Sequence, residues 1–172
     1  GSDPIDGYYS SFRYQVVYTA AELTAAGITA GNNINALGFS INEDYGGGNL
    51  NGYTIKMGYT TATNSAAHIS ASSITVKAPF SYNPTATSVG DFDMITFDTP
   101  FFWDGSGNLF IDICSSGPNS YTSPYGKVRT IASFTSNGSR HVRSDFGNRC
   151  GVSTGTTNTT KPQIRFFYAP VP

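Results

Sequence analysis

Residues 53–60 read Tyr53-Thr54-Ile55-Lys56-Met57-Gly58-Tyr59-Thr60, so large apolar side chains occupy every second position. Successive side chains of a β-strand point to opposite faces of its sheet. The stretch therefore predicts a strand with one buried face and one face in water. The same alternation returns at Leu37, Phe39 and Ile41, at Ile74 and Val76, and at Ile95 and Phe97.

Further β-branched and aromatic runs are separated by Gly, Asn, Pro and Ser, at residues 12–18, 109–114, 128–134, 140–146 and 164–168. Turn signals at this spacing are typical of roughly eight to ten strands in a sandwich. We expect an all-β fold, a two-sheet antiparallel β-sandwich of jelly-roll type. Residues 109–114 and 164–168 are apolar on both alternations apart from Asp112 and Arg165, which predicts two central strands covered on both sides.

One short helical segment is expected near residues 19–28. Thr19 and Glu22 have the spacing of a capping box, in which each side chain bonds the other residue's backbone N–H. Alanines follow, and Gly27 provides a stop. The segment should cap one end of the sandwich.

The chain has the size of one domain, residues 1–172, with 38% hydrophobic and 12% charged residues and a formal net charge of -1. Such a small charge creates no field that would attract nucleic acid. No apolar run approaches the roughly 20 residues that span a bilayer, so we expect no membrane insertion. Residues 1–7 and 169–172 are expected to be a scar or linker of a domain cut from a longer protein.

The chain has two cysteines, Cys114 and Cys150. We expect a disulfide between them, formed in an oxidising compartment. The alternative is a pair of free thiols in a reducing cytosol, which the Thr- and Asn-rich, Lys-poor composition disfavours. The protein is therefore expected outside the cell or at the cell surface.

Catalytic motifs are missing from the sequence. His68 and His141 each stand alone, and Gly105-Ser106-Gly107 is not the G-x-S-x-G turn of serine hydrolases. We therefore expect no enzyme. A glycoside hydrolase that assembles two carboxylates from distant strands is the remaining catalytic alternative. Its candidate residues include Glu22, Glu43, Asp93, Asp98, Asp112 and Asp145.

Calcium is the ion that this sequence could hold as a structural ligand, and no cofactor is required. Hard oxygen ligands could come from Asp91 and Asp93, from Glu43 and Asp44, or from Asp3 and Asp6. The competing interpretation is that these carboxylates are solvated at strand ends.

A few aromatic and cationic residues are candidates for ligand binding. Aromatic rings with a polar tip suit the flat, partly apolar faces of sugars, and arginine suits hydroxyls and carboxylates. The candidates are Tyr45 before a run of glycines, Trp103, Tyr121 and Tyr125 around a proline turn, and Arg140 and Arg143. The alternative is that the aromatics cover the core and the arginines pair with nearby aspartates.

Three segments carry a resemblance to a known kind of module. They are residues 15–28 with 34–39, residues 99–105 leading to 108–114, and Cys150 followed by residues 161–166. Together they resemble a β-rich accessory module of large secreted proteins of Bacteroidota, exported by the type IX system. Lys161 stands where that pattern usually has Arg. The resemblance implies a secreted, non-catalytic domain and a pairing of Cys114 with Cys150.

We therefore expect a carbohydrate-binding or adhesion module of a larger secreted protein. Its partner would be a cell-surface or polymeric glycan. The alternative is a structural spacer or protein–protein interaction domain that packs against neighbouring domains of the same protein.

Overall fold

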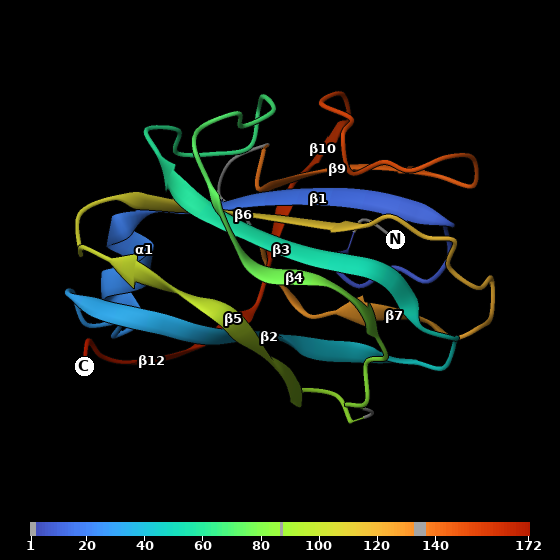
Figure 1. Ribbon diagram of the computed structural model, residues 1–172, viewed down its shortest axis with the longest axis horizontal. Helices are drawn as coiled ribbons and strands as arrows, with labels where there is room; N and C mark the ends of the chain where they lie inside the picture. Colours follow the sequence, from blue (N-terminus) through green and yellow to red (C-terminus); the bar gives the residue numbers. More distant parts are fainter. Residues whose placement is uncertain (1–2, 87, 133–136) are drawn as a thin grey trace.

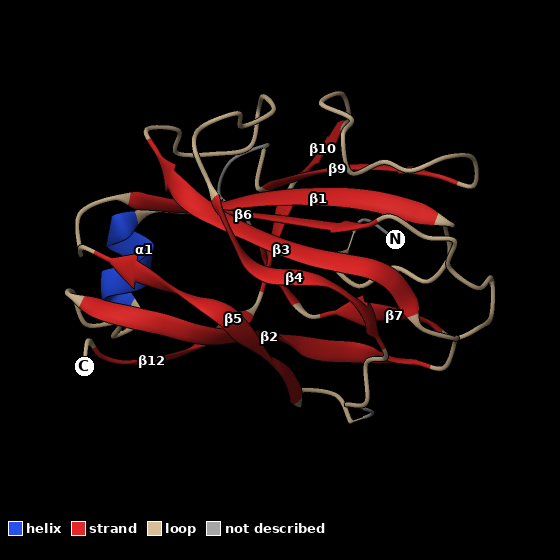
Figure 2. Ribbon diagram, in the orientation of Figure 1, coloured by secondary structure: helices blue, strands red, loops and turns tan. Residues whose placement is uncertain are grey.

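Two antiparallel sheets packed face to face make up most of the computed structural model, which describes residues 3–86, 88–132 and 137–172 (Figures 1 and 2). The all-β sandwich expected from the alternation is confirmed. Gly1, Ser2 and the last residues of the strand expected over 128–134 lie outside the described residues.

The larger sheet has the order β10-β9-β1-β6-β3-β4. Its strands are β10 (Thr156–Asn158), β9 (Ser139–Ser144), β1 (Ser11–Tyr18), β6 (Asn108–Ser115), β3 (Leu50–Thr60) and β4 (Ile74–Tyr82). The smaller sheet has the order β12-β2-β5, from β12 (Ile164–Pro170), β2 (Asn32–Tyr45) and β5 (Phe92–Trp103), and β7 (Tyr125–Val128) pairs with the far half of β2. A separate short pair joins β11 (Thr160–Pro162) to β8 (Thr130–Ala132).

The core lies between the inward faces of the two sheets. Tyr14, Ile113 and Ile55 stand side by side across β1, β6 and β3 and are buried. From the smaller sheet, Leu37 and Ile95 are paired neighbours on β2 and β5 and belong to the same core cluster. The residues that alternate in the sequence are thus the residues that meet between the sheets.

The two strands expected to be covered on both faces differ in burial: β6 is covered on both faces and β12 is not. β6 lies between β1 and β3, and every residue from Leu109 to Ser115 is buried, which confirms the expectation. β12 is at the edge of the smaller sheet, and Phe167 on its outer face is 61% exposed. That expectation was wrong, because no layer of the described residues covers the outer apolar side chains of β12.

The helix α1 (Ala20–Ala25) lies at one end of the sandwich and begins with the expected capping box (Figure 1). Glu22 N donates to Thr19 Oγ1 and Thr19 N donates to Glu22 Oε1, each at 3.2 Å. Leu23 enters the core. Glu22 Oε1 also accepts from Lys161 Nζ at 2.7 Å, so one carboxylate caps the helix and ties it to β11.

The outer face of the larger sheet carries a second buried layer. Val17, Phe110 and Ile69 form a small apolar cluster there. The side chain of Gln15 makes two hydrogen bonds with the backbone of Ile69: it donates to the carbonyl and accepts from the N–H, both at 3.0 Å. Asp112 accepts from Gln15 at 3.0 Å and pairs with Arg13 at 2.6 Å. Polar side chains therefore hold a loop over the middle of the sheet.

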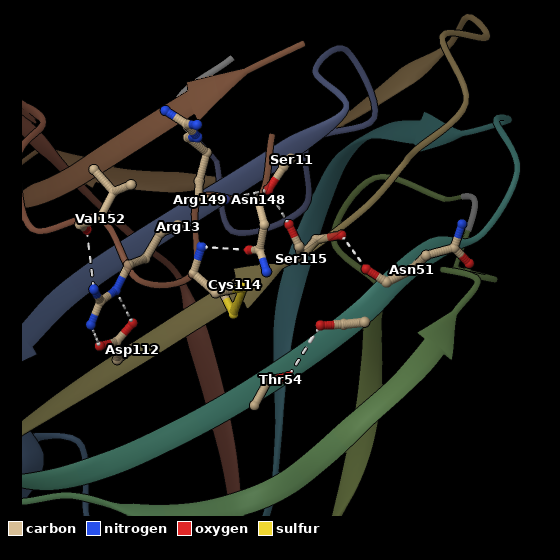
Figure 3. Close-up of a disulfide and its surroundings, with 12 residues drawn as sticks. Ser11, Arg13, Asn51, Thr54, Asp112, Cys114, Ser115, Asn148, Arg149 and Val152 are labelled. Atoms are coloured by element: carbon tan, nitrogen blue, oxygen red, sulfur yellow. Dashed lines mark hydrogen bonds and ion pairs between the residues drawn. A yellow bond between two sulfur atoms is a disulfide. The ribbon is translucent and has the colours of Figure 1, made fainter. Parts of the chain in front are cut away.

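The predicted disulfide joins Cys114 of β6 to Cys150 and is confirmed, with a Cα–Cα distance of 5.3 Å (Figure 3). It fastens the segment between β9 and β10 over the same outer face. Arg13 donates to the carbonyl of Val152 at 3.1 Å, and Arg149 N donates to Ser11 Oγ at 2.9 Å. The segment is thus held by one covalent bond and hydrogen bonds on either side of it.

Part of what we expected to be a scar or linker belongs to the domain instead. Residues 4–7 are buried because Ile5 enters the core and Tyr53 Oη donates to the carbonyl of Pro4 at 2.8 Å. At the other end, Ala169 and Pro170 pair with Asn33 and Asn32 of β2.

Removing the disulfide should lower stability without changing the fold. A variant with both Cys114→Ala and Cys150→Ala should lose about 4 kcal/mol of unfolding free energy, because the bridge closes a loop with a sequence separation of 36. Urea denaturation followed by circular dichroism measures this loss. Dithiothreitol should destabilise the wild-type protein and leave the variant unaffected, and equal sensitivity of both would contradict the prediction.

Asp112→Ala should cost about 3 to 5 kcal/mol, because it leaves the guanidinium of Arg13 partly buried without its anion. Replacing both residues, Arg13→Leu with Asp112→Leu, should cost less than the single change, since no unpaired charge remains. Unfolding free energies of the single and double variants test this order, and a double variant less stable than Asp112→Ala would refute it.

Candidate functional site

Four tyrosines gather at the end of the sandwich opposite α1. Ring centroids lie 4.9 Å apart for Tyr8 and Tyr9, 4.9 Å for Tyr8 and Tyr125, 5.0 Å for Tyr8 and Tyr121, and 5.2 Å for Tyr121 and Tyr125. Tyr121 is 65% exposed and Tyr8 is 37% exposed. We call Tyr8, Tyr9, Tyr121 and Tyr125 the tyrosine cluster. It presents aromatic rings to solvent while the rings brace one another.

Two segments far apart in sequence supply the cluster: the residues before β1, and the loop between β6 and β7 together with the first residue of β7 (Figure 1). Backbone hydrogen bonds join them, from Gly7 N to the carbonyl of Tyr125 and from Asn119 N to the carbonyl of Ser10, both at 3.0 Å. Asp6 Oδ1 accepts from Tyr8 N at 2.9 Å and fixes the turn in front of the rings. The cluster is therefore held from its backbone.

Arg143 of β9 joins the cluster from the side. Its guanidinium lies 4.7 Å from the ring centroid of Tyr9, and its Nη1 lies 3.9 Å from Asp6 Oδ2. Asp145 accepts from Ser10 N at 3.3 Å. Arg140 is three residues away on the same strand and donates to the carbonyl of Ala66 at 3.2 Å. The two arginines therefore serve different surfaces, as expected for an odd separation along a strand.

Carboxyls beside the cluster are desolvated. Burial, with the charge of Asp6 as the next cause, raises the pKa of Asp3 to about 6. Burial also raises the pKa of Asp6 above its usual range, against the hydrogen bond from Tyr8 and the charge of Arg143. The pKa of the Tyr8 phenol is raised, and the largest cause is a hydrogen bond with Tyr121. The Tyr8 phenol is therefore neutral near neutral pH.

Tyr45 and Trp103 are placed away from solvent. Tyr45 is 6% exposed, pairs with Tyr125 across β2 and β7, and donates to the carbonyl of Gly48. Trp103 is 1% exposed and donates from Nε1 to the carbonyl of Gly107 at 3.0 Å. Tyr45 is therefore a buried neighbour of Tyr125 in the cluster, while Trp103 is part of the core at the other end of the sandwich.

The carboxylates considered for calcium have protein partners or stand apart. Asp93 accepts from Tyr82 Oη at 2.7 Å and from Thr85, and Glu43 pairs with Lys127 at 3.1 Å. Asp91 and Asp44 are exposed. Within residues 3–86, 88–132 and 137–172, no group of three or more His, Cys, Asp or Glu is arranged to hold a metal ion. Calcium stays a prediction without an assembled set of side-chain ligands.

Several carboxylates of the hydrolase alternative hold elements together. Glu22 caps α1, Asp112 binds Arg13 and Gln15, and Asp98 accepts from the backbone of Ala78 at 2.9 Å. Hydrogen bonds from that backbone and from Lys77 lower the pKa of Asp98. The environment of Asp98 therefore favours its ionised form, and the contacts of all three carboxylates are structural.

The sequence identified Tyr121, Tyr125 and Arg143 but missed Tyr8 and Tyr9. The missed signal was the adjacent pair of tyrosines directly before the first strand. Strand β1 begins beside the point where β6 ends, since Phe12 pairs with Ser115. Residues before β1 and residues after β6 must therefore share one end of the sandwich.

No family model, curated protein or solved structure matches this chain. None of the helices in the described residues has the length and apolar character needed to cross a membrane. The site must therefore be judged from its own geometry and chemistry.

Asp3→Asn should stabilise the protein at neutral pH and have little effect near pH 4. The raised pKa of about 6 means that folded wild-type protein binds the proton more tightly than unfolded protein, so its stability falls as pH rises from about 4 to 6. Asparagine removes this charge and can still accept the hydrogen bond from Val128. We expect a gain of about 1 to 2 kcal/mol at pH 7.

Urea denaturation of both proteins at pH 4, 5, 6 and 7 measures this difference. Burial lowers the pKa of His141 to about 4, which acts in the opposite direction but is common to both proteins and cancels in the comparison. A difference that is constant across the four pH values would contradict the assignment to Asp3.

Proposed function

We propose that this chain is a non-catalytic carbohydrate-binding or adhesion module, and that the tyrosine cluster is its binding surface. The observation that carries the proposal is the gathering of four tyrosines, two of them exposed, on loops and a strand end at one end of a rigid sandwich. Binding residues are often found on loops that a rigid scaffold positions. In this proposal the module works outside the cell as one part of a larger secreted protein.

The chemistry of the cluster suits a neutral glycan. Aromatic faces pack on the C–H faces of sugar rings, while phenol and guanidinium groups supply hydrogen bonds to hydroxyls. The ring of Tyr9 is covered by Arg143, which leaves Tyr8 and Tyr121 as the rings most open to a ligand. The small net charge of the chain gives no attraction for a highly charged polymer.

A second candidate is the spacer or protein–protein interaction domain. It is favoured by the outer face of the smaller sheet, where Met94 and Phe167 line the same shallow pocket and are exposed by 37% and 61%. Apolar side chains close together on a surface are typical of contact with another protein. The two candidates use different surfaces and can be tested separately.

Tyr8→Ala and Tyr121→Ala should each weaken glycan binding about tenfold, since each removes one exposed aromatic face. A glycan array identifies the ligand of the wild-type protein, and titration calorimetry with that glycan measures the variants. Phe102→Ala is the matched control, because it also removes an exposed ring but lies at the opposite end. It should leave the dissociation constant unchanged.

Failure of the wild-type protein to bind any glycan on the array or any insoluble polysaccharide would overturn the proposal. Equal loss in Phe102→Ala and the tyrosine variants would also overturn it, since binding would then not depend on the cluster. Thermal unfolding of every variant establishes that the fold is retained.

A further inference from the structure

A groove runs between α1 and the edge of the smaller sheet, at the end of the sandwich away from the tyrosine cluster. It has a volume of about 420 Å³. Leu23 of α1 and Ala26, the residue that caps the C-terminal end of the helix, form part of one wall. Ile164 and Phe166 of β12 form the other, and Ile28 and Ile131 add to the apolar lining. Nothing in the proposed glycan site uses this groove.

The groove borders an unpaired strand edge. β12 pairs with β2 on one side, and none of the strands in the described ranges pairs with its other side. In an antiparallel ladder, hydrogen-bonded pairs alternate with pairs whose N–H and C=O groups point away from the partner. Ser40 N donates to the carbonyl of Gln163 at 3.0 Å, so residue 163 is bonded to β2.

The register then fixes which groups are free. Arg165 opposite Gly38 and Phe167 opposite Ala36 continue the bonded set that begins at Gln163. Ile164 and Phe166 fall between them and direct their N–H and C=O groups to the outer edge. Both residues line the groove, so the groove borders backbone whose free donors and acceptors have the spacing of a β-strand.

We propose that this groove binds an extended peptide from another protein, which adds to the smaller sheet as a strand beside β12. A row of free N–H and C=O groups at strand spacing is complementary to another extended backbone. An apolar lining facing that backbone selects a peptide that has apolar side chains at alternate positions.

Charge at the mouth of the groove specifies the partner further. The negative charge of Glu22 is paired with Lys161 at 2.7 Å. Arg165 also lines the groove, is exposed, and has its guanidinium 4.0 Å from the ring centroid of Phe92 rather than in an ion pair with a described residue. An acidic residue at one of the outward positions of the peptide would therefore be favoured.

The helix makes a single strand a better occupant than a second copy of this chain. A partner copy pairing through its own β12 would bring a whole sheet and its own α1 to the place where α1 already forms the far wall (Figure 1). A short peptide needs only the width of one strand, about 4.8 Å from its neighbour.

Selection from a phage-displayed library of random heptapeptides tests the proposal with the intact chain. Wild-type protein should enrich peptides with alternating apolar residues and at least one Asp or Glu. Ala26→Trp fills the groove from an exposed helix end and should weaken binding of a synthetic selected peptide by about tenfold or more. Ala25→Trp is the matched control on the same exposed turn and should bind as wild type does.

Amide hydrogen exchange supplies the second measurement. In the free protein, the amides of Ile164 and Phe166 should exchange faster than those of Arg165 and Phe167, and the selected peptide should slow them at least about tenfold. Arg165→Glu should shift the selection from acidic to basic peptides.

Four results would overturn the proposal: no enriched peptide, equal binding to Ala26→Trp, protection elsewhere in the protein, or a dimer formed through β12 in sedimentation experiments. Glycan binding remains measurable in each variant, so failure here leaves the tyrosine cluster independently tested.

Discussion

The burial of both faces of β6 is the constraint on which the rest of this structure depends. Its inward side chains lie in the core, but its outward side chains include a carboxylate and a sulfur, and both sides are buried. A buried carboxylate requires partners, which Arg13 and Gln15 supply from the neighbouring strand. Cys114 requires the segment that contains Cys150 to lie over the sheet. The outer layer is thus as closely specified as the core.

The same strand determines where the candidate site forms. β1 and β9 both flank this part of the sheet, with Ser11 opposite Ser144 and Phe12 opposite Ser115. The residues that precede β1, follow β6 and end β9 therefore leave the sheet at one end. Tyr8, Tyr121 and Arg143 come together because of antiparallel pairing, and the disulfide one residue before Ser115 steadies that end from the outside.

Much of the fold could be predicted because its rules are local. Alternation identified the strands, the Thr19 and Glu22 spacing identified the helix start, and two cysteines could pair in one way. The position of a strand within a sheet is not local. Residues 109–114 and 164–168 are equally apolar on both alternations, yet β6 is central and β12 is at an edge. Their difference lies in whether distant loops cover the outer face.

The site was predictable to the same degree. Tyr121 and Tyr125 stand out because a proline turn separates them, whereas Tyr8 and Tyr9 gain their meaning from the strand pairing that brings them to the same loop. Tyr45 and Trp103 were candidates for sugar binding as well, although the apolar neighbours of Trp103 already favoured a place in the core. Their burial depends on β7 and on the Gly107 turn, which approach from elsewhere in the chain.

Two of the edge strands in the described residues, β10 and β12, differ in length and in what borders them. β10 at the edge of the larger sheet has three residues, which leaves little backbone for another strand to bind. β12 has seven residues, including two phenylalanines, and is bordered by α1 across a groove rather than by another strand. Edges are commonly protected by charge or proline, and β12 has Arg165 near its start and Pro170 at its end. Between them, Phe166 and Tyr168 line the groove, so the protection is confined to the two ends of the strand.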